Sequence, residues 1–64
     1  MLQPNQMVYY TSSLLVQEAT FIRYDGDICV LNTAMGTLRI RSSRVFTAEE
    51  AAEKGLLEKV VKAG

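Results

Sequence analysis

Apolar and polar residues alternate with a period of two through the middle of the chain, a pattern typical of strands that bury one face. The clearest stretch runs from residue 17 to residue 32. It is divided by Asp25-Gly26, a dipeptide that favours a two-residue turn with both central residues at positive φ. A second turn is expected over residues 33–36. These signals predict a three-stranded antiparallel meander as the nucleus of the fold.

The two expected turns imply a register for this meander. The first turn sets Ile22 opposite Cys29, and the second sets Cys29 opposite Ile40. Because side chains alternate between the two faces of a strand, each face then has a defined composition. One face is almost wholly apolar and is predicted to be the core: Thr20, Ile22, Cys29, Leu31, Leu38 and Ile40. The other face collects Ala19, Phe21, Arg23, Ile28, Val30, Arg39 and Arg41.

The segments around the meander predict further strands. Residues 7–10 form an expected first strand, and residues 1–6 are interpreted as a loose lead-in because Pro4 and its polar neighbours show no period. The apolar run 14–16 is either the early part of the second strand or a loop over a barrel mouth. Residues 42–44 are polar and interrupt the alternation, and the apolar residues 45–46 that follow are expected to pack against the core. We therefore predict a mainly β protein, a small antiparallel barrel over residues 7–46.

A short C-terminal helix is predicted by a capping box at residues 47–50. The Thr47 hydroxyl can accept the Glu50 amide while the Glu50 carboxylate reaches back to the Thr47 amide. We expect a helix from Ala48 to Lys54, a bend at Gly55 and a second short helical segment, because the apolar positions change phase at Gly55. A continuous helix whose later face packs on a partner chain is the alternative.

Length and charge limit the class of protein. With 64 residues, the chain is interpreted as a single domain, 1–64. The formal net charge is zero, but all four arginines fall within residues 1–46 and all three lysines within 47–64. Neither part is polybasic, so strong non-specific binding of nucleic acid is not expected. No transmembrane run or secretory signal is apparent, and no membrane partner is expected.

No constellation of catalytic residues emerges. Cys29 is the only cysteine and the chain has no histidine, so we expect no disulfide, no metal site, no cofactor and a reducing, cytoplasmic location. Cys29 is interpreted as a core residue, and the carboxylates of Asp25 and Asp27 as parts of the hairpin turn. An enzyme is therefore not expected.

The arginine-bearing sheet face is the candidate interaction surface. Its residues are Phe21, Arg23, Ile28, Val30, Arg39, Arg41 and Arg44, with the tail over residues 56–61 as a second candidate. Either the arginine stems simply cover apolar atoms on a solvated face, or this face binds a partner. We expect a protein–protein interaction module with a protein partner not identifiable from sequence, and a homodimer at high micromolar concentration. The alternative function is nucleic-acid binding, with guanidinium groups and an aromatic ring contacting phosphates and bases.

The short, closely spaced strands resemble an SH3-like small β-barrel of the Tudor or KOW kind over residues 7–46. The stretch Arg41-Ser42-Ser43-Arg44-Val45-Phe46, followed by Thr-Ala-Glu-Glu-Ala at 47–51, is similar in style to small uncharacterised bacterial proteins. In those proteins an R-x-S-R-hydrophobic-F barrel end leads into an E-E-A helix. The chain carries neither the aromatic cage of methyl-lysine readers nor the glycine-rich basic loop of KOW domains. The resemblance therefore implies a fold and assigns no site residue.

Overall fold

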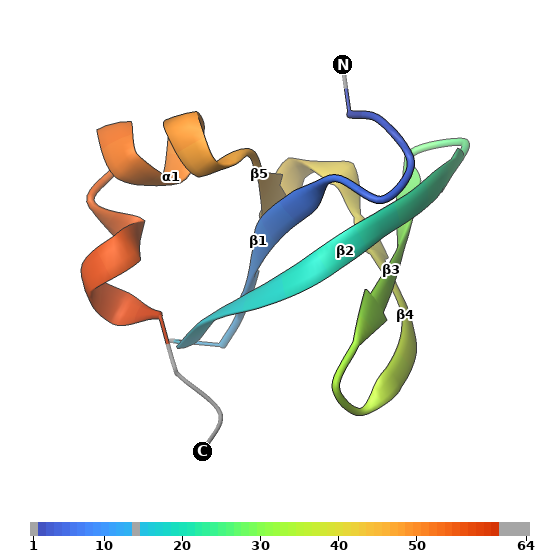
Figure 1. Cartoon of the computed structure of the whole chain (residues 1–64), viewed down its shortest axis with the longest axis horizontal. Helices are drawn as coiled ribbons and strands as arrows, with labels where there is room; N and C mark the ends of the chain where they lie inside the picture. The colour runs from blue at the N-terminus through green and yellow to red at the C-terminus, as the bar shows by residue number, and fades with distance from the viewer. Residues whose placement is uncertain (1, 14, 61–64) are drawn as a thin grey trace.

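The structure is a computed structural model that describes residues 2–13 and 15–60. In this part of the chain five strands form one antiparallel sheet in the order β4-β3-β2-β1-β5 (Figure 1). They are β1 (Met7–Ser12), β2 (Leu15–Asp25), β3 (Ile28–Thr33), β4 (Gly36–Arg41) and β5 (Val45–Phe46). The remaining elements are η1 (Ser42–Arg44), α1 (Ala48–Glu53) and η2 (Leu56–Lys59). The predicted class, mainly β with a short C-terminal helix, is confirmed.

The pairing of β3 with β4 agrees with the sequence-based register along its whole length. Leu31 pairs with Leu38, Val30 with Arg39 and Cys29 with Ile40. The turn lies at residues 34–35, where the Thr33 hydroxyl donates to the Gly36 carbonyl at 2.8 Å. Local turn chemistry is therefore enough to predict this register from the sequence.

The expected pairing of β2 with β3 is wrong. Asp25 pairs with Ile28, so the two turn residues are Gly26 and Asp27, and of the turn residues only Gly26 has positive φ, at 63°. A β-bulge then interrupts the ladder between Phe21 and Arg23. Because the bulge leaves Ile22 without a partner in β3, the alternation of faces changes at that point.

The bulge changes which side chains of β2 enter the core. Phe21, rather than Ile22, lies on the side of Cys29 and Leu31 and is only 2% exposed, while Ile22 is half-buried. Phe21 and Tyr24 also share this side, with ring centroids 4.8 Å apart. The buried core cluster consists of Val8, Tyr10, Ala19, Phe21, Cys29, Leu31 and Val45, with Leu2, Leu38 and Ile40 packed against it. Thus the β3 and β4 part of the predicted core is confirmed. The β2 part is wrong, because Ala19 and Phe21 are in the core in place of the predicted Thr20 and Ile22.

The described part of the lead-in, residues 2–6, is tied to the sheet by hydrogen bonds and is not loose. The Asn5 amide donates to the Phe21 carbonyl at 2.8 Å, and the Phe21 amide donates to the Gln6 carbonyl, also at 2.8 Å. Leu2 packs against the core cluster, and its amide donates to the Tyr24 hydroxyl at 3.3 Å. These contacts extend the pairing of β1 with β2 up to the bulge, and they use tertiary partners that a periodicity argument cannot detect.

The C-terminal region matches the prediction of a capped helix, a bend and a second short segment. Both capping-box hydrogen bonds between Thr47 and Glu50 are present, at 3.0 and 3.1 Å. Lys54 caps the end of α1, and Gly55 turns the chain with a left-handed φ of 70°. The alternative of one continuous helix is therefore wrong.

A second apolar cluster lies between the sheet and these helical segments. Tyr9, Val16 and Ala51 are its buried members, and Phe46, Leu56 and Val60 pack against them. Val60 also forms a parallel bridge with Val16. Leu15 and Val16 are the first residues of β2, so this part of the apolar run belongs to the second strand and is not a loop over a barrel mouth. Leu14 and Val61, which belong to the two predicted apolar runs, lie outside the described residues.

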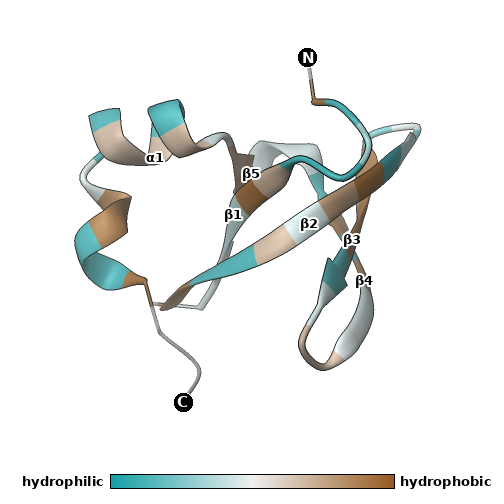
Figure 2. Ribbon diagram, viewed as in Figure 1, coloured by the Kyte–Doolittle hydropathy of each residue, from teal (hydrophilic) through white to brown (hydrophobic). Residues whose placement is uncertain are grey.

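Strand β1 contributes to both clusters. Figure 2 shows apolar stretches of β1 and of its two neighbours in the sheet, β2 and β5, and a helix α1 that is polar on part of its surface. The buried residues of β1 are Val8, Tyr9 and Tyr10. Val8 and Tyr10 enter the first cluster and Tyr9 the second, as strand alternation requires. β1 is thus buried on both faces.

Candidate protein-interaction face

The strongest candidate site is the outer face of β2, β3 and β4, here called the arginine face. Two cross-strand rows define it: Arg23, Val30 and Arg39 in one, and Asp25, Ile28 and Arg41 in the other. Since side chains opposite one another on antiparallel strands are about 4.5–5.5 Å apart at Cβ, each apolar residue of β3 has charged neighbours on both sides. Residues that are distant in sequence therefore form one continuous surface.

The centre of the arginine face is apolar and covered. Val30 is only 2% exposed, although it belongs to neither apolar cluster. Its register partners are Arg23 and Arg39, and both side chains are exposed at the surface of the sheet. Long arginine stems can cover apolar surface while the guanidinium groups remain in water. We interpret the low exposure of Val30 as cover by the stems of Arg23 and Arg39.

Two of the seven sequence-predicted surface residues offer no contact area in this structure. Phe21 is buried in the core on the other side of the sheet, because of the bulge at Ile22, and Val30 is covered. Ile28 is half-buried, whereas the four arginines are exposed: Arg23, Arg39, Arg41 and Arg44. The fold therefore brings the arginines together and leaves out the expected aromatic member.

One internal ion pair crosses the arginine face. Arg39 Nη1 lies 2.8 Å from Asp25 Oδ2, and both side chains are about half exposed. Sequence reasoning assigns Asp25 to the turn and misses this role, because it places the turn one residue too early. Three arginines against one aspartate leave the face with a charge of +2. In the described part of the chain, no further ion pair engages Arg23 or Arg41.

Arg44 extends the basic surface beyond the sheet. It lies in η1, three residues after Arg41, and the start of η1 is held by the Ser42 amide, which donates to the Asp27 carbonyl at 2.8 Å. This bond joins the end of β4 to the turn between β2 and β3. Arg44 is therefore attached to a fixed part of the backbone near the arginine face.

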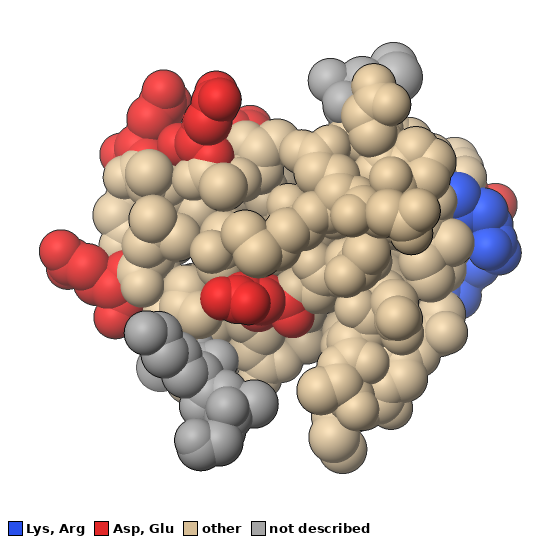
Figure 3. All heavy atoms as spheres, viewed as in Figure 1, with Lys and Arg blue, Asp and Glu red and all other residues tan. Residues whose placement is uncertain are grey.

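Charge is distributed unevenly over the molecule. In Figure 3 several acidic side chains lie over the side that carries α1 and another lies near the centre of the view, while a basic group with an acidic atom beside it lies at the opposite edge. The first turn of α1 contributes Glu49 and Glu50 to the acidic side. Such a dipolar surface orients an approaching charged partner by long-range electrostatics, an effect that weakens as salt is added.

A smaller hollow of about 200 Å³ lies at one end of the sheet core. It is lined by Leu2, Tyr24, Cys29, Ser42, Val45, Thr47 and Glu50. Burial raises the pKa of the Cys29 thiol, so the reactive thiolate form is disfavoured. The polar groups of Thr47 and Glu50 are engaged in the helix cap. The hollow therefore presents no activated group.

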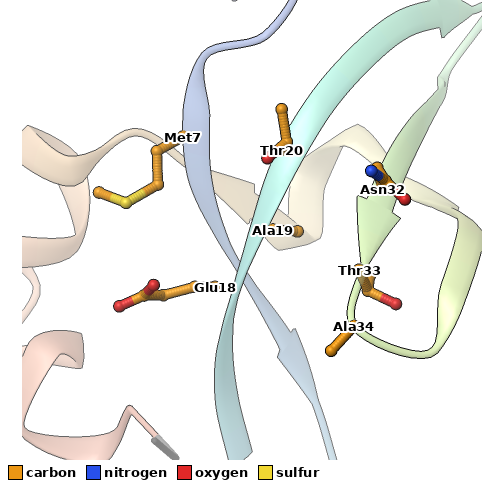
Figure 4. A pocket seen from close by; sticks show the side chains of 7 residues that line it. All are labelled: Met7, Glu18, Ala19, Thr20, Asn32, Thr33 and Ala34. Atoms are coloured by element: carbon orange, nitrogen blue, oxygen red, sulfur yellow. The ribbon is translucent and has the colours of Figure 1, made fainter. Parts of the chain in front are cut away.

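A larger open hollow of about 550 Å³ lies beside β1, β2 and β3 (Figure 4). Its lining residues are Met7, Glu18, Ala19, Thr20, Asn32, Thr33 and Ala34. Among the described residues that line the hollow, Glu18 is the one charged side chain and none is basic. It offers little for binding an anionic ligand, and an isolated carboxylate is a poor metal site.

Across residues 2–13 and 15–60, no group of three or more histidine, cysteine or acidic side chains is arranged to hold a metal ion. Within the same ranges, no helix has the length and apolar character needed to cross a membrane. No protein-family model, no curated protein and no solved structure matches the chain. What this protein does must therefore be inferred from its own residues.

Proposed function

We propose that this protein is a small binding module, an SH3-like barrel in architecture, that contacts an acidic protein partner through its arginine face and catalyses no reaction. The observation that carries the proposal is the arrangement of Arg23 and Arg39 around the covered Val30, with Arg41 beside them in the next row. The single thiol, Cys29, is buried and fits a reducing, cytoplasmic setting.

Physical chemistry favours arginine for this role. Its planar guanidinium group can form paired hydrogen bonds with a carboxylate, and arginine is enriched at the energetic centres of protein interfaces. Three neighbouring strands hold the backbone positions of these residues at fixed spacing, and the planar guanidinium fork loses less freedom per hydrogen bond formed than a lysine ammonium group. The acidic side near α1 would repel the same partner and favour one orientation of approach.

A comparative capture experiment tests the proposal. The wild-type protein is immobilised beside an R23E/R41E variant, which leaves the Arg39–Asp25 ion pair in place, and beside a K54E/K59E control with the same change in charge at exposed positions outside the arginine face. Proteins captured from a lysate of the native host are quantified, and thermal melts establish that all three proteins are folded.

We expect acidic proteins that bind the wild type and the lysine control but are depleted at least about tenfold by the arginine variant, since two charge-assisted contacts are reversed. Capture should also decline as salt rises. Equal capture by the two variants would show that the arginine face is not the contact surface.

Nucleic-acid binding is the alternative function, and only its phosphate-contacting component has support from the geometry. Arg23, Arg39 and Arg41 could contact phosphates, but Phe21 does not share their face and so cannot stack a base there. Retention on single-stranded DNA or RNA at about 50 mM salt that falls steeply as salt increases would favour this alternative. Absence of retention under that condition would remove it.

Self-association remains a separate prediction. Much of the apolar surface that suggested a homodimer is covered, because Phe21 and Val30 are buried and Val60 is half-buried, while Leu57 is 43% exposed. Sedimentation at increasing protein concentration tests the prediction. A mass that stays at 7.1 kDa up to high micromolar concentration would contradict it.

A further inference from the structure

The two edges of the sheet differ in their capacity to accept another strand. β5, at one edge, has two residues, and α1 follows after a single residue. β4, at the other edge, has six residues and pairs with β3 without a register shift. An edge strand presents unpaired N–H and C=O groups, which are a template for strand addition. β4 is therefore the edge with the greater capacity for pairing.

Common forms of edge protection are absent from β4. It contains no proline and no bulge, and in the described residues its backbone groups at positions 37–41 have no hydrogen-bond partner outside the sheet ladder. Figure 1 shows the hairpin of β3 and β4 extending away from α1, so the helix does not cover this edge. Charge is the remaining protective device, supplied by Arg39 and Arg41.

The side chains of β4 specify what could pair with it. Arg39 and Arg41 lie on the arginine face and are exposed, whereas Leu38 and Ile40 lie on the core side and are half-buried. A strand added beside β4 would place one set of alternate side chains next to Arg39 and Arg41 and the other set next to Leu38 and Ile40. Acidic residues suit the positions beside the arginines, and apolar residues suit the positions beside Leu38 and Ile40.

A second copy of this chain does not suit the edge. In an antiparallel pairing of two β4 strands, the arginines of both copies would lie on the same face of the extended sheet and close to one another. Like charges on neighbouring strands are destabilising, and the effect would be repeated by both Arg39 and Arg41. The charge of the edge therefore favours an acidic partner over self-pairing.

We propose that the β4 edge binds an extended segment of a partner protein in which acidic and apolar residues alternate, and that this segment pairs with β4 as an additional strand. The main-chain ladder provides binding, and the alternation selects the partner. The inference rests on the proposed protein-binding function and adds to it the conformation and sequence character of the bound segment.

The test uses the full chain labelled with ¹⁵N and synthetic hexapeptides of three designs, matched in length to the six residues of β4. The first peptide alternates glutamate and valine. The second has the same composition arranged as a block of glutamate followed by a block of valine. The third design is the alternating peptide with every second amide N-methylated. It is prepared in two forms, one methylated at the odd positions and one at the even positions, so that one form must block the amides that face β4.

Binding is followed by amide chemical shifts, by hydrogen exchange and by titration at low salt. We expect the alternating peptide to perturb and protect amides of β4, with smaller effects at α1. Three changes should each weaken binding by about tenfold. The block peptide loses the alternation that matches the two faces of β4. One form of the N-methylated peptide loses the ladder hydrogen bonds, and the R39E/R41E variant loses the charge pairs.

The outcomes separate this inference from the proposed function. If the block and both N-methylated peptides bind as well as the alternating one, and β4 amides gain no protection, strand addition is wrong although the arginine face still binds acidic ligands. If the alternating peptide pairs with β4 but host proteins are captured equally by R23E/R41E and K54E/K59E, the proposed function fails and the edge inference stands. If no peptide perturbs β4 at millimolar concentration, the inference is overturned.

Discussion

The two apolar clusters of this protein share strand β1 but are held in different ways. Val8 and Tyr10 enter the sheet cluster with Phe21 and Leu31, while Tyr9, between them, points to the cluster beneath α1. The sheet cluster contains most of the largest fully buried side chains, and its members lie on paired strands. The helix-side cluster has three buried members and three that are only partly buried.

This difference indicates where the stability of the molecule resides. In the sheet cluster, cross-strand hydrogen bonds and apolar contacts support the same register, so loss of one large side chain affects several strands. In the helix-side cluster, Ala51 and its neighbours are positioned by a six-residue helix, which depends on its cap and on packing rather than on its own length. We therefore expect perturbations of the sheet cluster to have the larger effects.

The largest effect is expected for Phe21→Ala. Removing this buried ring should reduce the free energy of unfolding by about 3–5 kcal/mol, which approaches the whole stability of a small domain. The neighbouring Ile22→Ala, at the bulge, should cost less than half as much because Ile22 is only half-buried. Urea unfolding followed by circular dichroism measures both.

Because Phe21→Ala could leave the protein unfolded, Phe21→Leu provides a milder comparison on the same scale. It should remain folded and lose about 1–2 kcal/mol. A larger loss for Ile22→Ala than for Phe21→Ala would contradict the observed bulge and restore the register expected from the turn.

Overfilling the helix-side cluster should have an intermediate effect. Ala51 is 0% exposed, so Ala51→Leu should destabilise the protein by about 1–3 kcal/mol through overpacking. The adjacent Ala52 is exposed, and Ala52→Leu should change stability by less than about 0.5 kcal/mol. Equal effects of the two variants in thermal melts would argue against the packing of α1 on the sheet.

Loss of the helix cap should have a smaller effect. Thr47→Ala removes the side-chain oxygen that accepts the Glu50 amide and should cost about 1 kcal/mol. Thr47→Ser retains the oxygen and should restore most of the stability. Hydrogen exchange at α1 should increase more than exchange in β3. A uniform increase in both elements would mean that α1 and the sheet unfold as one unit.

The smallest effect concerns the Cys29 thiol. Burial raises its pKa in the folded protein, so the unfolded chain loses this proton first as pH rises through the ordinary thiol pKa of 9.0. The contribution of Cys29 to stability is therefore fully present below that value and declines above it. The stability difference between wild type and Cys29→Ala should shrink as pH rises above about 9. A difference independent of pH would contradict this linkage.

The candidate site is only partly predictable from the chain. The rows of β3 and β4 that carry Val30, Arg39 and Arg41 follow from alternation and a local turn, and the structure agrees with them. The placement of Phe21 does not follow, because it depends on the β-bulge between Phe21 and Arg23, and moving the turn by one residue leaves the faces of β2 unchanged. The Asp-Gly-Asp sequence allows the turn to begin at either Asp25 or Gly26, and the exposed ion pair of Arg39 with Asp25 depends on that choice.

The sequence by itself determined the strand-rich class, the register of β3 with β4, and the capped helix that bends at Gly55, because each depends on residues close together along the chain. Tertiary structure alone decided the bulge at Ile22 and the burial of Phe21. The backbone hydrogen bonds of Phe21 are made with Asn5 and Gln6, beside the bulge, and no local pattern in the sequence indicates these distant partners.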